Sequence, residues 1–130
     1  MNKKKSALIL TALLVSAVFM TALAGIEANL NISSAAINLP QSMNACFSLV
    51  AKIYCDISVY NVKLEVKNSN GTWSFVSWLS SPPGAINAVF LNSVKSYASS
   101  CTKNKTYRIS ATFDAGGETV TRTSNEATYN

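Results

Sequence analysis

The sequence contains no histidine, and this absence excludes several kinds of active site. A serine or cysteine nucleophile is commonly activated by a neighbouring histidine, so neither a Ser-His nor a Cys-His pair can form. The three cysteines include no Cys-x-x-Cys pair, and no histidine exists to complete a four-ligand zinc site. We therefore expect a protein that is not an enzyme and that carries neither a metal nor a cofactor.

Charged residues are also scarce, at 13% of the chain, and they are unevenly placed. Lys3, Lys4 and Lys5 account for three of the 11 basic residues. Without them, 8 basic residues stand against 6 acidic ones, which leaves a net charge of only +2. Nucleic-acid binding requires a clustered basic patch, so we expect no nucleic-acid partner.

The one long hydrophobic run lies beside those lysines. The stretch 6–20 contains no charge, and Ala22-Leu23-Ala24 then supplies a small-x-small pattern before Gly25. A basic start, an apolar run and such a site form a secretory signal peptide, so we expect cleavage after Ala24 and a secreted, extracellular product. The alternative is a retained anchor, because the run approaches the ~18 residues that span a membrane. In the cleaved form, only the signal peptide would have met the membrane.

The rest of the chain shows no sustained helical periodicity. We expect a flexible lead-in over 25–36 and one domain over 37–130. Alternating apolar and polar residues separated by turn signals predict about seven short antiparallel strands, and therefore an all-β sandwich of two sheets. The expected strands cover 35–39, 45–51, 59–67, 73–79, 86–94, 106–114 and 118–124, with a connection over 53–58.

A hairpin over Val59–Leu79 is the most clearly patterned part of this domain. Its first arm alternates strictly, and its Asn70-Gly71 step suits a tight turn. Both tryptophans lie on the second arm, so we expect this hairpin to bury more area than any other element. The predicted core consists of Phe47, Leu49, Leu64, Val66, Trp73, Phe90, Tyr107, Ile109 and Phe113.

The second arm of this hairpin cannot bury both of its tryptophans if it is a regular strand. Trp73 and Phe75 share one parity, whereas Val76 and Trp78 share the other. We expect Trp78 to be the exposed one, although it could instead pack under the loop at 82–83. An exposed aromatic ring can stack on a sugar or a partner surface. The candidate contact residues are Trp78, Tyr60 and Tyr54.

The last third of the chain resembles strands F and G of a fibronectin type III domain. Tyr107 matches the tyrosine that opens strand F in that family, and Gly117-Glu118 matches the step after its F–G turn. A longer pattern, which adds Asn70-Gly71-Thr72-Trp73 and Ser77-Trp78, is similar to a group of uncharacterised small secreted proteins of Gram-positive bacteria. The resemblance implies an immunoglobulin-like sandwich and export, and it implies no catalytic residues.

The sandwich topology of that family bears on the three cysteines. The start of strand B and the loop before strand F lie at the same end of such a sandwich, and Cys46 and Cys101 occupy these positions. We therefore expect a Cys46–Cys101 disulfide, with Cys55 left over. The other interpretation is three unpaired thiols, because connectivity cannot be read from a sequence.

These observations leave three functions open. The main hypothesis is a secreted structural or protein-interaction module whose partner is an unknown protein. The alternative is a module that binds carbohydrate or a cell-wall glycan through exposed aromatic residues. An enzyme or toxin-like effector is the third, and the missing histidine disfavours it.

Overall fold

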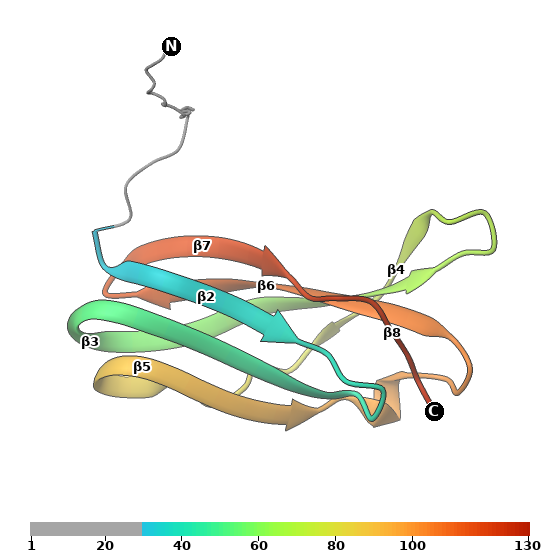
Figure 1. Cartoon of the computed structure of the whole chain (residues 1–130), viewed down its shortest axis with the longest axis horizontal. Coiled ribbons are helices and arrows are strands. Elements are labelled where there is room, and N and C mark those ends of the chain that lie inside the picture. Colours follow the sequence, from blue (N-terminus) through green and yellow to red (C-terminus); the bar gives the residue numbers. More distant parts are fainter. Residues whose placement is uncertain (1–29) are drawn as a thin grey trace, which may run out of the picture.

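The computed structural model describes residues 30–130, so the predicted signal peptide and the start of the predicted lead-in, 25–29, lie outside the described residues. The described chain forms seven antiparallel strands and one short 3-10 helix, η1 (Figure 1). Within 30–130, no helix has the length and apolarity needed to cross a membrane. The elements are β2 (Ile32–Asn38), β3 (Asn44–Lys67), β4 (Trp73–Leu79), β5 (Ala85–Ser96), η1 (Ala98–Ser100), β6 (Thr106–Ala115), β7 (Glu118–Thr123) and β8 (Ala127–Thr128).

The predicted all-β antiparallel fold is confirmed, but the strands belong to one curled sheet and not to two separate sheets. Strand β3 is the reason. It runs for 24 residues without interruption and pairs with β2 and β5 along its first half and with β4 and β6 along its second. The connection predicted over 53–58 is therefore wrong, because these residues continue the strand.

The bend of β3 is held by hydrogen bonds around Asp56. Its side-chain Oδ1 accepts the backbone N–H of Asn87 at 3.0 Å. Its backbone carbonyl accepts the N–H of Gly116, in the turn between β6 and β7, at 3.0 Å. The register of the β3–β5 pair shifts on both sides of Cys55, as expected where extra residues bend a strand. One acidic residue thus ties the bend to the strands on either side.

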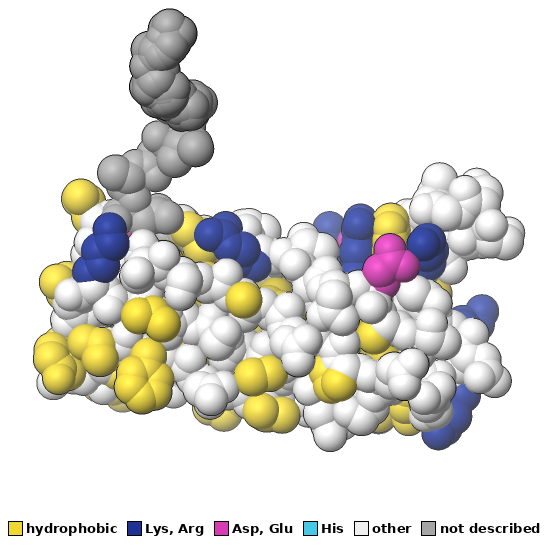
Figure 2. Space-filling view, in the orientation of Figure 1, with side chains coloured by type: hydrophobic (Ala, Val, Ile, Leu, Met, Phe, Trp, Pro, Cys, Tyr) yellow, Lys and Arg dark blue, Asp and Glu magenta, His cyan; other side chains and the backbone are white. Residues whose placement is uncertain are grey.

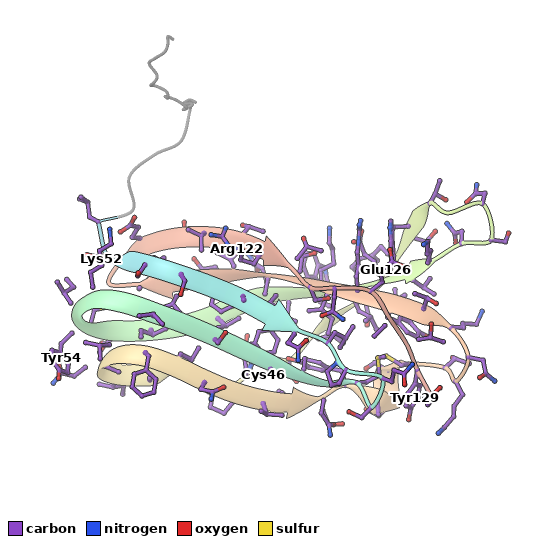
Figure 3. The ribbon with its side chains drawn as sticks, viewed as in Figure 1. Cys46, Lys52, Tyr54, Arg122, Glu126 and Tyr129 are labelled. Atoms are coloured by element: carbon purple, nitrogen blue, oxygen red, sulfur yellow. The ribbon has the colours of Figure 1, made fainter. Side chains whose placement is uncertain are left out.

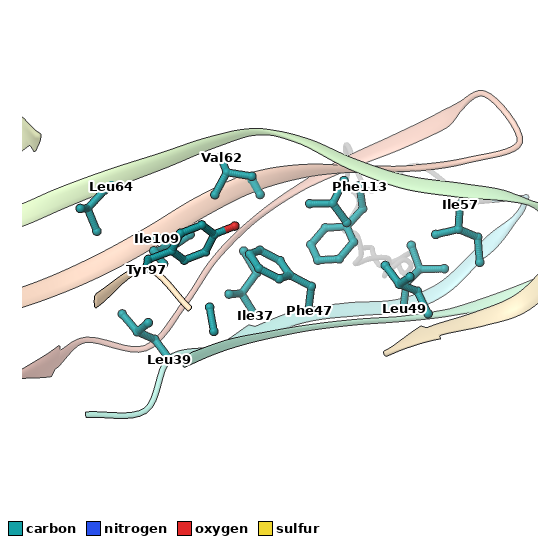
Figure 4. Packing of buried hydrophobic residues seen from close by; sticks show 14 of the residues in the cluster. Ile37, Leu39, Phe47, Leu49, Ile57, Val62, Leu64, Tyr97, Ile109 and Phe113 are labelled. Atoms are coloured by element: carbon teal, nitrogen blue, oxygen red, sulfur yellow. The ribbon is translucent and has the colours of Figure 1, made fainter. Parts of the chain in front are cut away.

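The core lies between the two halves of the curled sheet (Figure 4). Phe47 from the first half of β3 meets Tyr97 and Phe113, with ring centroids 6.3 Å away in both cases. Burying one such large apolar side chain contributes roughly 1.5–3 kcal/mol. The largest fully buried side chains are Phe47, Phe113, Leu39, Met43, Leu49, Ile57, Leu64, Ile109 and Val62.

The predicted core is largely correct, with three exceptions. Phe90 is 63% exposed because β5 pairs it with Val50, which also points away from the core. Trp73 is only half-buried, and Val66 lies partly buried at the margin of the core. The other predicted core residues, Phe47, Leu49, Leu64, Tyr107, Ile109 and Phe113, are buried.

The predicted hairpin is confirmed, and its expected share of the core is not. Strand β4 pairs with the second half of β3, and the turn closes through a bond from Asn68 N–H to the Thr72 carbonyl at 2.7 Å. Gly71 has φ +86°, a conformation that glycine adopts at low cost. No residue of β4 is fully buried, and the hairpin tip extends beyond the body of the sheet (Figure 1). The hairpin therefore contributes an exposed surface more than a core.

The start of the sheet lies earlier than the sequence predicts. Strand β2 begins at Ile32, which is 2% exposed, so the residues from Ile32 onward belong to the sheet and not to a flexible lead-in. The guanidinium of Arg122 on β7 donates to the carbonyl of Ala35 on β2 at 3.1 Å. This bond joins two strands from opposite halves of the sheet, which lie side by side in Figure 1.

The three cysteines are free, which contradicts the predicted Cys46–Cys101 disulfide. Cys46 lies between the buried residues Ala45 and Phe47 of β3, so it points to the outer face, where its thiol contacts Asn92 Oδ1 at 3.2 Å. Cys101, after η1, packs against the core instead. The prediction considered only the end of the sandwich at which each cysteine lies. It left out the alternation of the strand 45–51, which places Cys46 on the face opposite the buried Phe47.

Candidate functional site

A bulge in β4 places all its large aromatic rings on one face of the sheet. The β3–β4 register pairs Leu64 with Ser77 and Glu65 with Phe75, so Val76 is an extra residue. Beyond it, Trp78 pairs with Lys63, which faces the same outer side as Glu65. The predicted division of Trp73 and Phe75 from Trp78 is therefore wrong. An extra residue reverses the parity of every residue that follows it.

The two tryptophans on this face differ in what covers them. The Trp73 ring is covered by cations, since the Arg108 guanidinium carbon lies 4.3 Å and the Lys67 ammonium 5.9 Å from its centre. Trp78 is 64% exposed, as predicted, and does not pack under the loop at 82–83. Its ring contacts only Phe75 among the described aromatic residues, at 5.5 Å between centroids. Trp78 is thus the tryptophan whose ring is open to a ligand.

A groove of about 440 Å³ runs from Trp78 across the outer face of β3, β6 and β7. Trp78 and Lys63 face each other across β4 and β3, and Ser110 and Thr123 continue the same row on β6 and β7. Three strand spacings of ~4.8 Å make this row about 14 Å long. The groove is lined by Asn61, Lys63, Glu65, Trp78, Arg108, Ser110, Ala111, Thr112, Thr121 and Thr123.

A chain of charged side chains forms one side of the groove. Glu65 accepts a hydrogen bond from Arg108 Nε at 2.8 Å, and the Lys63 ammonium lies 3.6 Å from its other oxygen. Glu65 has only 14% of its side chain exposed, so its charge is balanced where water is partly excluded. Two cations around one carboxylate leave this side of the groove positive. The remaining lining is mainly hydroxyl and amide groups, which both donate and accept hydrogen bonds.

Two of the three predicted contact residues, Trp78 and Tyr60, lie on the same outer face of the sheet, although only Trp78 lines the groove. Tyr60 pairs with Thr112, a lining residue of the groove, and it is 36% exposed on the same outer face as Trp78. Tyr54 is 70% exposed but lies at the bend of β3, at the opposite end of the molecule from β4 (Figures 1 and 3). Tyr54 therefore belongs to a different surface.

Several lining residues were not predicted from the sequence. Lys63 and Arg108 stand at polar positions of strictly alternating strands, so their outward direction was readable. Their position beside Trp78 was not readable, because it depends on the Val76 bulge and on the pairing of β3 with β6. The threonines of β7 gave only the signal of an exposed strand.

The opposite outer face, formed by β2, β5 and the first half of β3, has a different character. Val50 pairs with Phe90 and Cys46 with Val94, which places three large apolar side chains on this face at 48%, 63% and 61% exposure for Val50, Phe90 and Val94. A shallow cavity of about 330 Å³ lies over Val50 and Phe90. In Figure 2, hydrophobic side chains gather at the left end of this face, whereas charged side chains lie mostly along its upper margin.

Two side chains near η1 have raised pKa values because they are buried. Burial raises the pKa of the Tyr97 phenol to about 12 and that of the Cys101 thiol to about 11. The Tyr97 hydroxyl donates to the Ser80 carbonyl at 2.7 Å, which fixes the loop between β4 and β5. Neither group lines the groove, so both serve the packing of the fold.

Among residues 30–130, no three Cys, Asp or Glu side chains come close enough to hold a metal ion together. No protein-family model, curated protein or solved structure matches this chain. The groove beneath Trp78 must therefore be interpreted from its own residues.

Proposed function

We propose that this chain is an exported, non-catalytic module that binds carbohydrate in the groove beneath Trp78. One observation carries the proposal. An exposed tryptophan, 64% accessible, borders a groove whose far side is made of hydroxyl-bearing side chains. This combination is the one expected for a ligand that has an apolar ring face and polar edges.

A sugar ring has this chemistry. Its C–H groups can lie against an aromatic face, while its hydroxyls exchange hydrogen bonds with groups that both donate and accept. Phe75 supports the Trp78 ring at 5.5 Å, which reduces the entropy lost when a ligand immobilises it. Ser110, Thr112 and Asn61 line the groove and carry the hydroxyl and amide groups for these hydrogen bonds. The groove is shallow, which suits a polysaccharide that lies along it.

The export step of this proposal is supported by the start of the sequence. Lys3–Lys5, the uncharged run after them and the Ala22-Leu23-Ala24 site together form the three parts of a signal peptide. A site outside the cell would expose the groove to wall or extracellular polysaccharides. We also propose that the curled sheet has an immunoglobulin-like, fibronectin type III-like arrangement. The chain would then be related to small secreted proteins of Gram-positive bacteria.

The test is a binding screen of the folded chain against an oligosaccharide array and insoluble peptidoglycan. We expect retention of the wild type and loss of about 2 kcal/mol of binding free energy, roughly 30-fold in Kd, for Trp78→Ala. Tyr54→Ala is the matched control, because it removes an aromatic ring that is equally exposed but lies at the bend of β3. No binding of the wild type to any glycan would overturn the proposal.

A protein-interaction role is the second candidate, and the apolar face over Val50, Phe90 and Val94 favours it. Exposed apolar side chains that lie together commonly mark a contact surface for another protein. Phe90→Lys would place a charge in the centre of that face and leave the groove intact. If Phe90→Lys abolished a protein interaction that Trp78→Ala preserved, the second candidate would replace the first.

A further inference from the structure

We propose that the ligand of the groove is an acidic saccharide, whose carboxylate pairs with Lys63 while its ring stacks on Trp78. This inference rests on the proposed carbohydrate-binding function and names the ligand class. It comes from the charges that line the groove and from the direct pairing of Lys63 with Trp78 across β3 and β4.

The charges that line the groove do not balance. Its lining contains two cations, Lys63 and Arg108, and a single anion, Glu65, which contacts both. The next charged group along β3, Lys67, is already balanced by Glu126 at 3.0 Å. Asp114 lies farther along β6, does not line the groove and accepts the N–H of Gly117 at 2.9 Å. The lining therefore carries an excess of one positive charge, which a neutral ligand would leave unmatched.

The two cationic side chains are not held equally firmly. Arg108 is held from two sides, by its 2.8 Å hydrogen bond to Glu65 and by its stacking on Trp73 at 4.3 Å. The Lys63 ammonium lies 3.6 Å from Glu65, beyond normal hydrogen-bond length, and 36% of its side chain is exposed. Glu65 keeps its hydrogen bond to Arg108 when the long contact to Lys63 is given up, so Lys63 can turn to a ligand at little cost.

Lys63 also lies in the right place relative to Trp78. Residues directly opposite each other on antiparallel strands have Cβ atoms ~5 Å apart, so an acidic group on a ring stacked on Trp78 falls within reach of the Lys63 ammonium. Ser110 lies on the other side of Lys63 and supplies a hydroxyl to the same ring or the next one. A bond between an ammonium and a carboxylate is stronger than one between neutral groups. Lys63 therefore distinguishes acidic from neutral sugars.

The experiment compares two oligosaccharides that differ only at C6 of each ring. Titration calorimetry of the folded chain uses a β-1,4-linked glucuronate tetramer and cellotetraose, which has CH₂OH where the first has a carboxylate. An array that contains neutral and uronic-acid oligosaccharides repeats the comparison on other backbones. We expect acidic members to bind at least about tenfold more tightly than their neutral counterparts. We also expect this preference to shrink as salt is added.

Variants separate the role of the charge from that of the ring. Lys63→Gln should abolish the preference while neutral binding persists, and Lys63→Arg should retain the preference. Trp78→Ala should weaken the binding of acidic and neutral oligosaccharides by the same factor. Thermal unfolding of each variant confirms that it is folded, as expected for side chains that are partly or largely exposed.

These measurements test the preference for acidic saccharides separately from carbohydrate binding itself. Equal binding of acidic and neutral counterparts, or a preference that survives in Lys63→Gln, overturns the acidic ligand and leaves carbohydrate binding in place. Binding of no glycan by the wild type overturns both.

Discussion

The two outer faces of the curled sheet share strand β3 but differ in nearly every chemical respect. The face over β4, β6 and β7 combines Trp78 with Lys63, Glu65, Arg108 and a set of hydroxyls. On the face over β2 and β5, the strand register displays small polar and apolar side chains, and none of them is charged. That second set is Ser34, Ala36, Asn38, Cys46, Ser48, Val50, Phe90, Asn92 and Val94.

This difference shows that exposure of hydrophobic side chains is not by itself a signature of one kind of site. Phe90 and Trp78 have nearly the same exposure, 63% and 64%. Phe90 has Val50 opposite it on β3, which favours an apolar partner surface. Trp78 has Lys63 opposite it, which favours a ligand with a ring and a polar edge. The cross-strand neighbour, more than the aromatic residue, sets the chemistry of each face.

The largest expected effect contrasts the inside of the fold with either face. Phe47→Ala should lower the free energy of unfolding by about 3–5 kcal/mol, because the ring is fully buried between Tyr97 and Phe113. Phe90→Ala is the matched control, since it removes the same ring from the outer face of the same half, and should cost within about 0.5 kcal/mol. Urea denaturation measures both. Similar losses for the two variants would mean that Phe90 is part of the core.

An intermediate effect concerns the Val76 bulge of β4, the strand that carries Trp78 beside Lys63. Deleting Val76 would give β4 a strict alternation in which Trp73, Phe75 and Trp78 all stay on one face, opposite Lys67, Glu65 and Lys63. We expect the deletion to change stability by no more than about 1 kcal/mol and to preserve glycan binding.

The informative control for this deletion is deletion of Ser74, which lies on the other side of the bulge. That change moves Trp73 away from Arg108 but leaves Phe75 and Trp78 in place. Glycan binding should therefore persist, while the fluorescence of Trp73 should shift as its ring loses the cations. Loss of binding on deletion of Val76 would show that the bulge itself shapes the groove.

The smallest expected effect is a difference in thiol reactivity between the outer face and the core margin. Burial raises the pKa of Cys101 from 9.0 to about 11, so at pH 8 its thiolate fraction is about 100-fold lower than that of an unperturbed thiol. Between pH 9 and about 11 the thiol of the unfolded chain ionises while the buried thiol does not, so the free energy of unfolding falls across this range and is unaffected by Cys101 below it.

Alkylation at pH 8 followed by peptide mass spectrometry checks this difference. Cys46, which is half-exposed on the apolar face, should be modified well before Cys101. The unfolded chain in urea should lose the difference, since burial causes it. A Cys46 that resists alkylation together with Cys101 would instead indicate that the two thiols are joined, contrary to the structure.

The sequence predicts the regular strands of this fold well, but it does not predict the bend of β3 or the groove. The strands of strict alternation, at 59–67 and 106–114, were placed correctly because one buried face imposes a period of two. The continuity of β3 through 53–58 was missed, because a strand that changes layers loses its alternation at the bend. The exposure of Trp78 was predicted, although for a parity argument that the Val76 bulge overturns. The groove itself depends on which strands pair, and this sequence has no local signal for that.

The continuity of β3 has a consequence for how the chain reaches its final shape. The first half of β3 needs β2, which precedes it, and β5, which follows it, whereas the second half also needs β6, which ends at Ala115. The local hairpins β3–β4 and β6–β7 can form early, but the sheet cannot be completed before β6 is present, because the β3–β5 and β3–β6 pairings join residues far apart in sequence. Such topologies fold slowly. Because the second half of β3 lacks one of its two neighbours until β6 is made, the sheet stays incomplete until residue 115 has been synthesised.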